Sequence, residues 1–315
     1  MYKEPEEHYW SGRIDDDINR DAFRLHQVIL KRSQNEPIDF ESGFTFIGFE
    51  SDEGVRRNKG RIGARKAPNA LRKATASLPL QFHEEVKIED VGNIACEGNQ
   101  LEAAQAELGN AIQMLYQKGR TPIIFGGGHE TLYGHYLGAR KHVSHGSSIG
   151  IINIDAHFDM RSEEKPTSGT MFKQILEQDK HAGYLCIGIQ EFGNTKELFK
   201  TADDYNCEYI LEEDVTTDNY KNTFQQIDLF TKKYDHIIVT LCTDSIIASA
   251  APGVSAPSPF GLEPKVVRHL LRYIAAKNNV LSFDISEVNP DLDMDGRTVK
   301  LGAYLVAEVI NHFHK

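Results

Sequence analysis

The sequence predicts an α/β protein in which helices flank a parallel β-sheet. Short apolar runs recur along the 315-residue chain, and they are continuous rather than alternating, as in strands that are buried on both faces. Stretches with helical spacing of apolar residues lie between these runs, and this alternation is typical of parallel α/β domains. Because no break in composition marks a boundary, we expect residues 1–315 to form a single domain, with residues 1–40 as an N-terminal extension packed on it.

The elements follow from these patterns in chain order. The predicted strands are Thr45–Phe49, Pro122–Phe125, Ile149–Ile154, Tyr184–Ile189, His236–Leu241 and Val280–Phe283. Helices are predicted where apolar residues fall on one face, at Leu101, Leu108, Ile112 and Leu115, at Val266, Val267, Leu270 and Ile274, and at Leu301, Leu305, Val309 and Phe313. Two segments, Ser51–Lys66 and the Pro-, Gly-, Ala- and Ser-rich Ser249–Gly261, are predicted to be ordered loops.

Charge and composition exclude several classes of function. The net charge of −11 argues against a general nucleic-acid binder, which needs a basic surface to displace counterions, but a local basic pocket can still bind an anionic substrate. Met1–Asp15 lacks the basic start and apolar stretch of a signal peptide, and no apolar run approaches the roughly 20 residues that span a bilayer. The four widely spaced cysteines predict reduced thiols. We expect a soluble cytoplasmic protein without a nucleic-acid or membrane partner.

The stretch N-I-D-A-H-F-D-M-R at positions 153–161 contains an unusual alternation of polar residues. Asp155, His157 and Asp159 occupy every second position directly after the apolar run Ile149–Ile154. On an extended chain such residues point to the same side, spaced by about 6–7 Å. Three ionisable groups placed side by side without a cation would repel one another and lose hydration. The alternation therefore predicts metal ligands at the end of a strand.

Other predicted strands also end in groups that bind metals. His129 stands behind three glycines, Cys242 and Asp244 form a C-T-D pair, and Glu287 follows the last predicted strand. In open α/β sheets, ligands bind beyond the carboxyl ends of the strands, so we expect these side chains to converge. The nitrogen, oxygen and sulfur donors of six of these residues exceed the needs of one structural zinc and match a two-metal site: His129, Asp155, His157, Asp159, Cys242 and Asp244.

The remaining histidines and cysteines are expected to be structural. His135, His142 and His145 are predicted to be solvated, and Cys96, Cys186 and Cys207 to be core or near-surface thiols.

Together these motifs resemble those of the ureohydrolase family, which includes arginases and agmatinases. The family elements G-G-x-H, D-A-H-x-D, S-x-D-x-D and E-x-N-P correspond here to Gly126–Glu130, Asp155–Asp159, Thr240–Asp244 and Glu287–Pro290. Four further stretches resemble the formimidoylglutamase branch: N-K-G-R-I-G-A-R (58–65), D-A-H-F-D-M-R (155–161), T-S-G-T (167–170) and A-P-G-V-S-A-P (251–257). The resemblance implies a single three-layer α/β/α domain with a mostly parallel sheet of about eight strands, commonly assembled into homo-oligomers.

The resemblance also implies two divalent cations, Mn²⁺ in this family, and assigns their ligands by position. One cation would be held by His129, Asp155, Asp159 and Cys242, and the other by Asp155, His157, Cys242 and Asp244. Most ureohydrolases carry Asp where this chain has Cys242, and a softer thiolate shifts preference from Mn²⁺ toward Zn²⁺, Fe²⁺ or Co²⁺. The proton-shuttle histidine of arginases is missing, with Phe172 in its place, which argues against arginase activity.

The implied reaction is hydrolysis of N-formimidoyl-L-glutamate to L-glutamate and formamide in histidine degradation, through a metal-bridging hydroxide. Glu287 is expected to pair with the amidinium nitrogens of the substrate. Asp159 is expected to accept a proton and pass it to the departing amine.

Arginines are expected to bind the two substrate carboxylates. Arg161 is the first choice, with Ser168 and Thr170 in the following loop as hydrogen-bond donors, and Arg61 and Arg65 are rivals. Two alternatives to this function stay open. One is another ureohydrolase activity, such as that of an agmatinase or guanidino-acid hydrolase; the other is a catalytically silent metal-binding relative.

Overall fold

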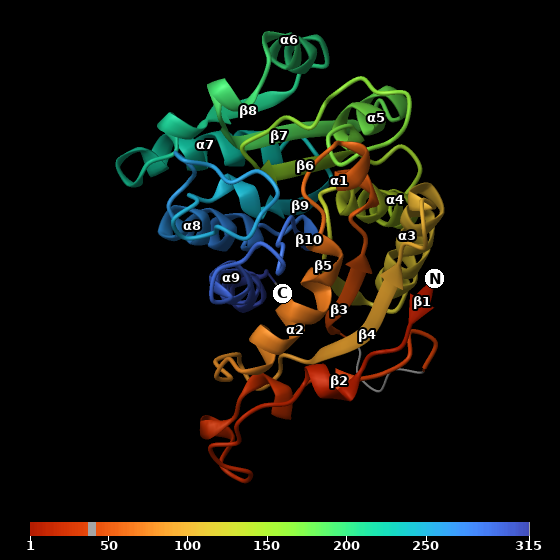
Figure 1. The fold of residues 1–315 in the computed structure, drawn as a ribbon, viewed down its shortest axis with the longest axis vertical. Coiled ribbons are helices and arrows are strands. Elements are labelled where there is room, and N and C mark those ends of the chain that lie inside the picture. Colours follow the sequence, from red (N-terminus) through yellow and green to blue (C-terminus); the bar gives the residue numbers. More distant parts are fainter. Residues whose placement is uncertain (37–41, 315) are drawn as a thin grey trace.

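A computed structural model describes residues 1–36 and 42–314, and its centre is a single twisted sheet (Figure 1). The strands are β1 (Tyr2–Lys3), β2 (Leu30–Lys31), β3 (Gly43–Glu50), β4 (Ile88–Ala95), β5 (Arg120–Phe125), β6 (Ile149–Ile154), β7 (Ala182–Ile189), β8 (Glu208–Leu211), β9 (His236–Cys242) and β10 (Val280–Ser286). Their order is β1-β4-β3-β5-β10-β9-β6-β7-β8, and β2 also pairs with β4. Only the pairing of β1 with β4 is antiparallel among the described strands.

Helices cover both faces of the sheet and complete three layers. They are α1 (Glu53–Arg57), α2 (Ala67–Ala76), α3 (Leu101–Gln117), α4 (Thr131–His142), α5 (Met171–Gln178), α6 (Lys196–Asp204), α7 (Tyr220–Thr231), α8 (Pro264–Ala275) and α9 (Arg297–His312). In Figure 1, α3, α4 and α5 lie on one side of the sheet, and α2, α8 and α9 lie on the other. Each side has its own apolar core.

The predicted fold class is confirmed, since a mostly parallel sheet lies between two helical layers. All six predicted strands and all three predicted helices are present. The central strands are buried along almost their whole length, which explains their continuous apolar sequences. The ten-stranded sheet exceeds the expected eight by the two-residue strands β1 and β2. Within the predicted loop Ser51–Lys66 the structure forms the short helix α1, whereas 249–261 contains no helix or strand.

The N-terminal segment lies along the β4 edge of the sheet. β1 and β2 pair with β4, and the ring of Trp10 stacks on Phe46 of β3 with centroids 5.6 Å apart. The indole N–H of Trp10 also donates to Asp90 at 2.6 Å. The predicted end of the N-terminal extension at residue 40 lies outside the described residues.

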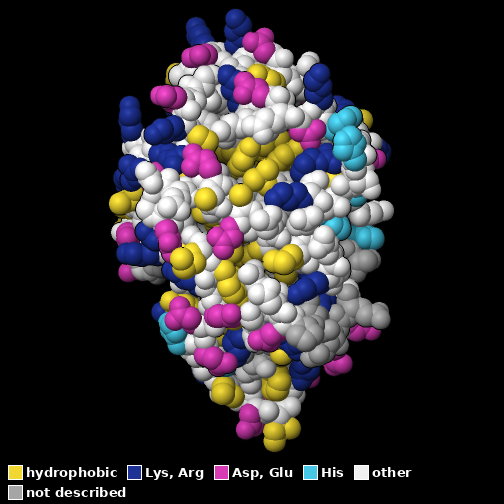
Figure 2. Space-filling model, turned by 90° about the vertical axis from the view of Figure 1, so that its right-hand side faces the viewer, with side chains coloured by type: hydrophobic (Ala, Val, Ile, Leu, Met, Phe, Trp, Pro, Cys, Tyr) yellow, Lys and Arg dark blue, Asp and Glu magenta, His cyan; other side chains and the backbone are white. Residues whose placement is uncertain are grey.

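The surface carries both signs of charge. On the face shown in Figure 2, Lys and Arg side chains are interspersed with Asp and Glu, and no continuous basic patch covers it. None of the helices in the described residues has the length and apolar character needed to cross a membrane.

The topology brings four strand ends together. β5, β10, β9 and β6 are consecutive neighbours in the sheet although they come from distant parts of the sequence. They run parallel to one another, so their carboxyl ends meet at one edge, where ligands bind in open α/β sheets.

Candidate metal centre

Each of the four central strands delivers a polar side chain to this edge. His129 follows β5, Asp155 follows β6 directly, Cys242 is the last residue of β9, and Glu287 follows β10. A short 3-10 turn over Thr243–Ser245 carries Asp244. The expected convergence of these strand ends is therefore found in the structure.

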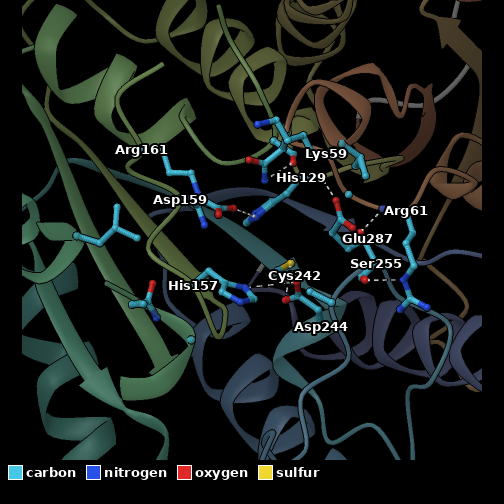
Figure 3. A pocket seen from close by; sticks show the side chains of 18 residues that line it. Lys59, Arg61, His129, His157, Asp159, Arg161, Cys242, Asp244, Ser255 and Glu287 are labelled. Atoms are coloured by element: carbon cyan, nitrogen blue, oxygen red, sulfur yellow. Dashed lines mark hydrogen bonds and ion pairs between the residues drawn. The ribbon is translucent and has the colours of Figure 1, made fainter. Parts of the chain in front are cut away.

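Two overlapping groups of donor atoms lie close enough to share metal ions. Ligand atoms of His129, Asp155 and Cys242 lie within 4.8 Å of one another, and so do those of Asp155, His157 and Asp244. Because Asp155 belongs to both groups, it stands between the two positions. Figure 3 shows His129, His157, Cys242 and Asp244 pointing toward a common centre.

Asp159 completes the cluster on the His129 side. The Nδ1 atom of His129 lies 2.9 Å from Oδ2 of Asp159 and 3.0 Å from Oδ2 of Asp155. Asp159 has a φ of 48°, which is the left-handed region that residues other than glycine rarely adopt. The strained turn aims this carboxylate back at the cluster, and such strain is characteristic of functional sites.

The glycines before His129 allow a close approach between β5 and the loop after β3. A Cβ atom on Gly127 would lie 1.8 Å from the carbonyl oxygen of Ser51. No side chain fits there, so glycine is required for His129 to reach the cluster.

The carboxylates of the cluster stabilise positive charge at two points. Burial lowers the pKa of His129, but hydrogen bonds to Asp155 and Asp159 raise it well above its ordinary value. The same balance holds for His157. Burial lowers its pKa, but Asp244 and Asp155 raise the pKa well above the ordinary value of histidine. Burial and the charge of Asp155 raise the pKa of Asp159 to about 6. The site thus favours cations electrostatically.

Cys242 adds a sulfur atom to the same cluster of carboxylates. Its Sγ lies 2.8 Å from Oδ1 of Asp244. Burial raises the pKa of the thiol well above its ordinary value, and the neighbouring Asp155 and Asp244 raise it further. A thiolate at this position therefore needs a cation beside it, and metal coordination deprotonates thiols outright.

Glu287 lines the same cavity, and the pKa of its carboxyl is raised, as that of Asp159 is. Its Oε1 accepts a hydrogen bond from the backbone N–H of His129 at 2.9 Å, and its φ is 66°. Burial raises the pKa of this carboxyl well above its ordinary value, and Asp244 and Glu130 raise it further. A cationic group that enters the cavity would relieve this repulsion.

The cavity in front of the cluster measures about 410 Å³. Besides the cluster, its lining includes Asn58, Lys59, Arg61, Arg161, Ser168, Asn194 and Ser255. The cavity therefore has candidate metal ligands at its floor and three basic side chains, Lys59, Arg61 and Arg161, in its lining.

Only some of the residues predicted to bind substrate line the cavity. Arg161 and Ser168 line the cavity, whereas Arg65 and Thr170 are not among the lining residues. Thr170 instead bonds within its own loop, where its hydroxyl accepts from the backbone N–H of residue 167 at 3.0 Å. Arg61 lines the cavity, but its guanidinium donates to the carbonyl oxygens of residues 254 and 255 at 2.8 and 2.9 Å.

The sequence patterns did not indicate several residues that line the cavity. Asn58, Lys59 and Asn194 line the cavity, and Lys59 has a left-handed φ of 61°. The N-K-G sequence at 58–60 was a turn signal that could have indicated this. His142 and His145 are exposed, as predicted. The prediction that His135 is solvated is wrong: its side chain is fully buried, with both ring nitrogens hydrogen-bonded.

The chain belongs to the arginase family, whose model matches residues 42–311. It is 50% identical over 317 residues to a formimidoylglutamase of Geobacillus sp. (strain WCH70), covering 100% of this chain and 98% of that protein. The crystal structure of formimidoylglutamase from Bacillus subtilis has a TM-score of 0.83 at 22% identity, covering 96% of both chains. The structure of Trypanosoma cruzi formiminoglutamase with Mn²⁺ has a TM-score of 0.80 at 24% identity, covering 92% of this chain and 97% of that chain.

Proposed function

We propose that the protein hydrolyses N-formimidoyl-L-glutamate to L-glutamate and formamide, a step of histidine degradation. The observation that carries the proposal is that one cavity contains both acidic metal-binding groups and basic side chains. A buried carboxyl, Glu287, faces a cluster of metal-binding donors, and basic side chains stand at the rim. This arrangement suits a substrate with a cationic amidine at one end and carboxylates at the other. The high identity to formimidoylglutamases over the whole chain supports it.

The donor set fits two divalent cations. We propose that His129, Asp155, Asp159 and Cys242 hold one ion, and that Asp155, His157, Cys242 and Asp244 hold the other. Carboxylate and imidazole donors suit Mn²⁺, while the thiol favours softer ions. When bound, such a pair of ions lowers the pKa of a water molecule so that hydroxide is available near neutral pH.

The reaction itself depends on two carboxyl groups of the chain. Glu287 pairs with the amidinium nitrogens and fixes the electrophilic carbon, a charge-assisted contact. Water adds to that carbon, and Asp159, whose carboxylate lies beside the cluster, accepts its proton. Asp159 then delivers the proton to the departing amine of glutamate as the carbon–nitrogen bond breaks. The products are formamide and L-glutamate.

The carboxylate end of the substrate lies at the basic rim. We propose Arg161 and Lys59 as its partners, because neither side chain makes a hydrogen bond or ion pair with another described residue, whereas Arg61 is held by backbone carbonyls. Ser168, which accepts from Asn58 at 3.3 Å, is a further donor toward the substrate. Thr170 is proposed to hold the shape of this loop.

We also propose that residues 1–315 form one domain, and that the protein acts in the cytoplasm as a homo-oligomer without a nucleic-acid partner. The net charge of −11 supports the absence of nucleic-acid binding. The exposed rings of Phe192 and Phe260, which line one surface hollow, are candidates for a contact between subunits.

Metal analysis combined with product detection tests the proposed function. The purified chain is loaded with Mn²⁺ and assayed for formamide and glutamate release, with agmatine and guanidino acids as competing substrates. We expect release from formimidoylglutamate only, and a loss of several orders of magnitude in Asp244→Ala. Turnover of agmatine or a guanidino acid instead would assign a different ureohydrolase activity. Bound metal without any turnover would identify a silent relative.

A further inference from the structure

A chain of buried polar groups extends from the metal centre into the interface between β10 and α4. The Nε2 atom of His129 lies 3.1 Å from the hydroxyl oxygen of Thr240 on β9. That hydroxyl donates to Oδ1 of Asp284 on β10 at 2.7 Å. The other carboxylate oxygen, Oδ2, lies 2.7 Å from Nδ1 of His135 on α4. His135 is thus linked to the cluster although it has no contact with it.

The chain continues on the far side of His135. Its Nε2 lies 2.5 Å from Oγ of Ser282, and this oxygen lies 2.5 Å from the hydroxyl of Tyr116 on α3. Because the carboxylate of Asp284 only accepts, Nδ1 of His135 carries the hydrogen of the neutral ring, and Nε2 accepts from the Ser282 hydroxyl. The Ser282 oxygen in turn accepts a hydrogen bond from the Tyr116 hydroxyl.

Burial forces these groups to satisfy one another. The side chains of His129, Thr240, Asp284 and His135 are each 1% exposed or less, so water cannot replace a missing partner. Buried polar groups without partners are strongly unfavourable. The direction of each hydrogen bond can therefore be worked out by counting protons.

The count places a hydrogen on Nε2 of His129. Threonine has one hydroxyl hydrogen, and a carboxylate only accepts, so the hydrogen of Thr240 points to Asp284. The oxygen of Thr240 can then only accept from His129, and Nε2 of His129 must carry a hydrogen. In the neutral imidazole, the lone pair then lies on Nδ1, the atom that faces Asp155 and Asp159.

We infer that His135 is a positioning residue, which acts through Asp284 and Thr240 to hold His129 in the tautomer and orientation that suit metal binding by Nδ1. The inference rests on the metal centre of the proposed function. Its physical basis is general: metal-binding histidines are oriented by the partner of their second nitrogen, and loss of such a partner weakens metal binding about 10–100-fold.

The Mn²⁺ affinity of the full chain tests this inference, measured from the electron paramagnetic resonance signal of free Mn²⁺. We expect His135→Ala to weaken binding by about 10–100-fold. His135→Asn should bind close to the wild type, because its amide N–H can replace Nδ1–H as the donor to Asp284. His145→Asn, exposed in the turn that follows the same helix, is the matched control and should not change the affinity.

A second variant separates the chain of hydrogen bonds from a general loss of packing. Thr240→Val should weaken Mn²⁺ binding by itself. The double variant Thr240→Val with His135→Ala should bind Mn²⁺ no more weakly than the weaker-binding of the two single variants, because both substitutions interrupt the same chain of hydrogen bonds. Unfolding of the metal-free proteins shows whether each variant is folded. If His135→Ala does not fold, His135→Asn and Thr240→Val carry the test.

Three results would overturn the inference: unchanged affinity in His135→Ala or Thr240→Val, equal loss in His135→Asn and His135→Ala, or additive losses in the double variant. A wild-type protein that binds Mn²⁺ without releasing formamide would overturn the proposed function alone.

Discussion

The basic rim of the cavity leads to a quantitative prediction about substrate binding. Lys59 follows α1 and Arg161 follows the D-A-H-F-D segment, and both line the cavity (Figure 3). Neither pairs with another described side chain, so both are available to the two carboxylates of formimidoylglutamate. We predict that Lys59→Met and Arg161→Met each raise KM for this substrate and leave the bound metal unchanged.

The size of the effect follows from the exposure of the two side chains. A hydrogen bond to a charged group contributes about 1.5–3 kcal/mol when shielded, while exposed ion pairs contribute about 0.2–1 kcal/mol. Both residues are exposed at the rim, so we take about 1–1.5 kcal/mol for each, an intermediate value. Because about 1.4 kcal/mol corresponds to a factor of ten, each variant should raise KM about five- to twelvefold. The double variant should approach the product of the two factors.

Initial rates of formamide release, measured over a range of substrate and salt concentrations, provide the assay. Salt should raise the wild-type KM, since exposed charges are screened within about 10 Å at 0.1 M ionic strength, and the double variant should lose most of this dependence. Arg65→Met is the matched control: this residue lies on the same segment as Lys59 but does not line the cavity. Unchanged KM in both single variants, or an equal rise in Arg65→Met, would refute the assignment.

Three further predictions concern the centre and the fold. Cys242→Asp should increase the affinity for Mn²⁺ relative to Zn²⁺, because a carboxylate is harder than a thiolate; competitive metal binding measures this, and an unchanged ratio contradicts it. Glu287→Gln should lower kcat/KM about 10²–10³-fold with unchanged metal content, and retained activity would remove Glu287 from the mechanism. Arg72→Met should lower the free energy of unfolding by about 3–5 kcal/mol in urea titrations, because Arg72 is buried with two hydrogen bonds to Asp90 at 2.8 Å. A loss below about 1 kcal/mol would match an exposed ion pair instead.

The sequence predicted those strands whose burial makes them apolar along their whole length. β6, with the sequence I-G-I-I-N-I, is fully buried and reads as apolar throughout. β4 is also fully buried, yet its sequence is I-E-D-V-G-N-I-A and it was missed. Its acidic residues Glu89 and Asp90 are compensated by Arg120 and Arg72, partners that lie far away in the chain or on another element. Single-sequence patterns contain no information about such distant compensation.

The site shows the same limit. The spacing of Asp155, His157 and Asp159 correctly predicted that these side chains belong to one cluster, but the extended chain expected there is wrong. β6 ends at Ile154, the chain then bends, and Asp159 has a left-handed φ of 48°. His135 looked like a polar residue of a helix, and the prediction of solvation failed because its partner Asp284 comes 149 residues later. Lys59 was missed because its side chain reaches the cavity only through the folding of its loop over the sheet edge.

Two residues of β10 and its end fix the position of His129. Asp284 is linked to the imidazole by hydrogen bonds through Thr240, and Glu287 accepts a hydrogen bond from the backbone N–H. Asp284 and Glu287 are three residues apart, at the end of the same strand. Neighbouring strands are fixed at about 4.8 Å by their backbone hydrogen bonds, so the position of His129 depends on the pairing of β5 with β10. A substitution that shifts β10 should therefore impair metal affinity and amidine binding together, whereas changes at the rim should affect substrate binding alone.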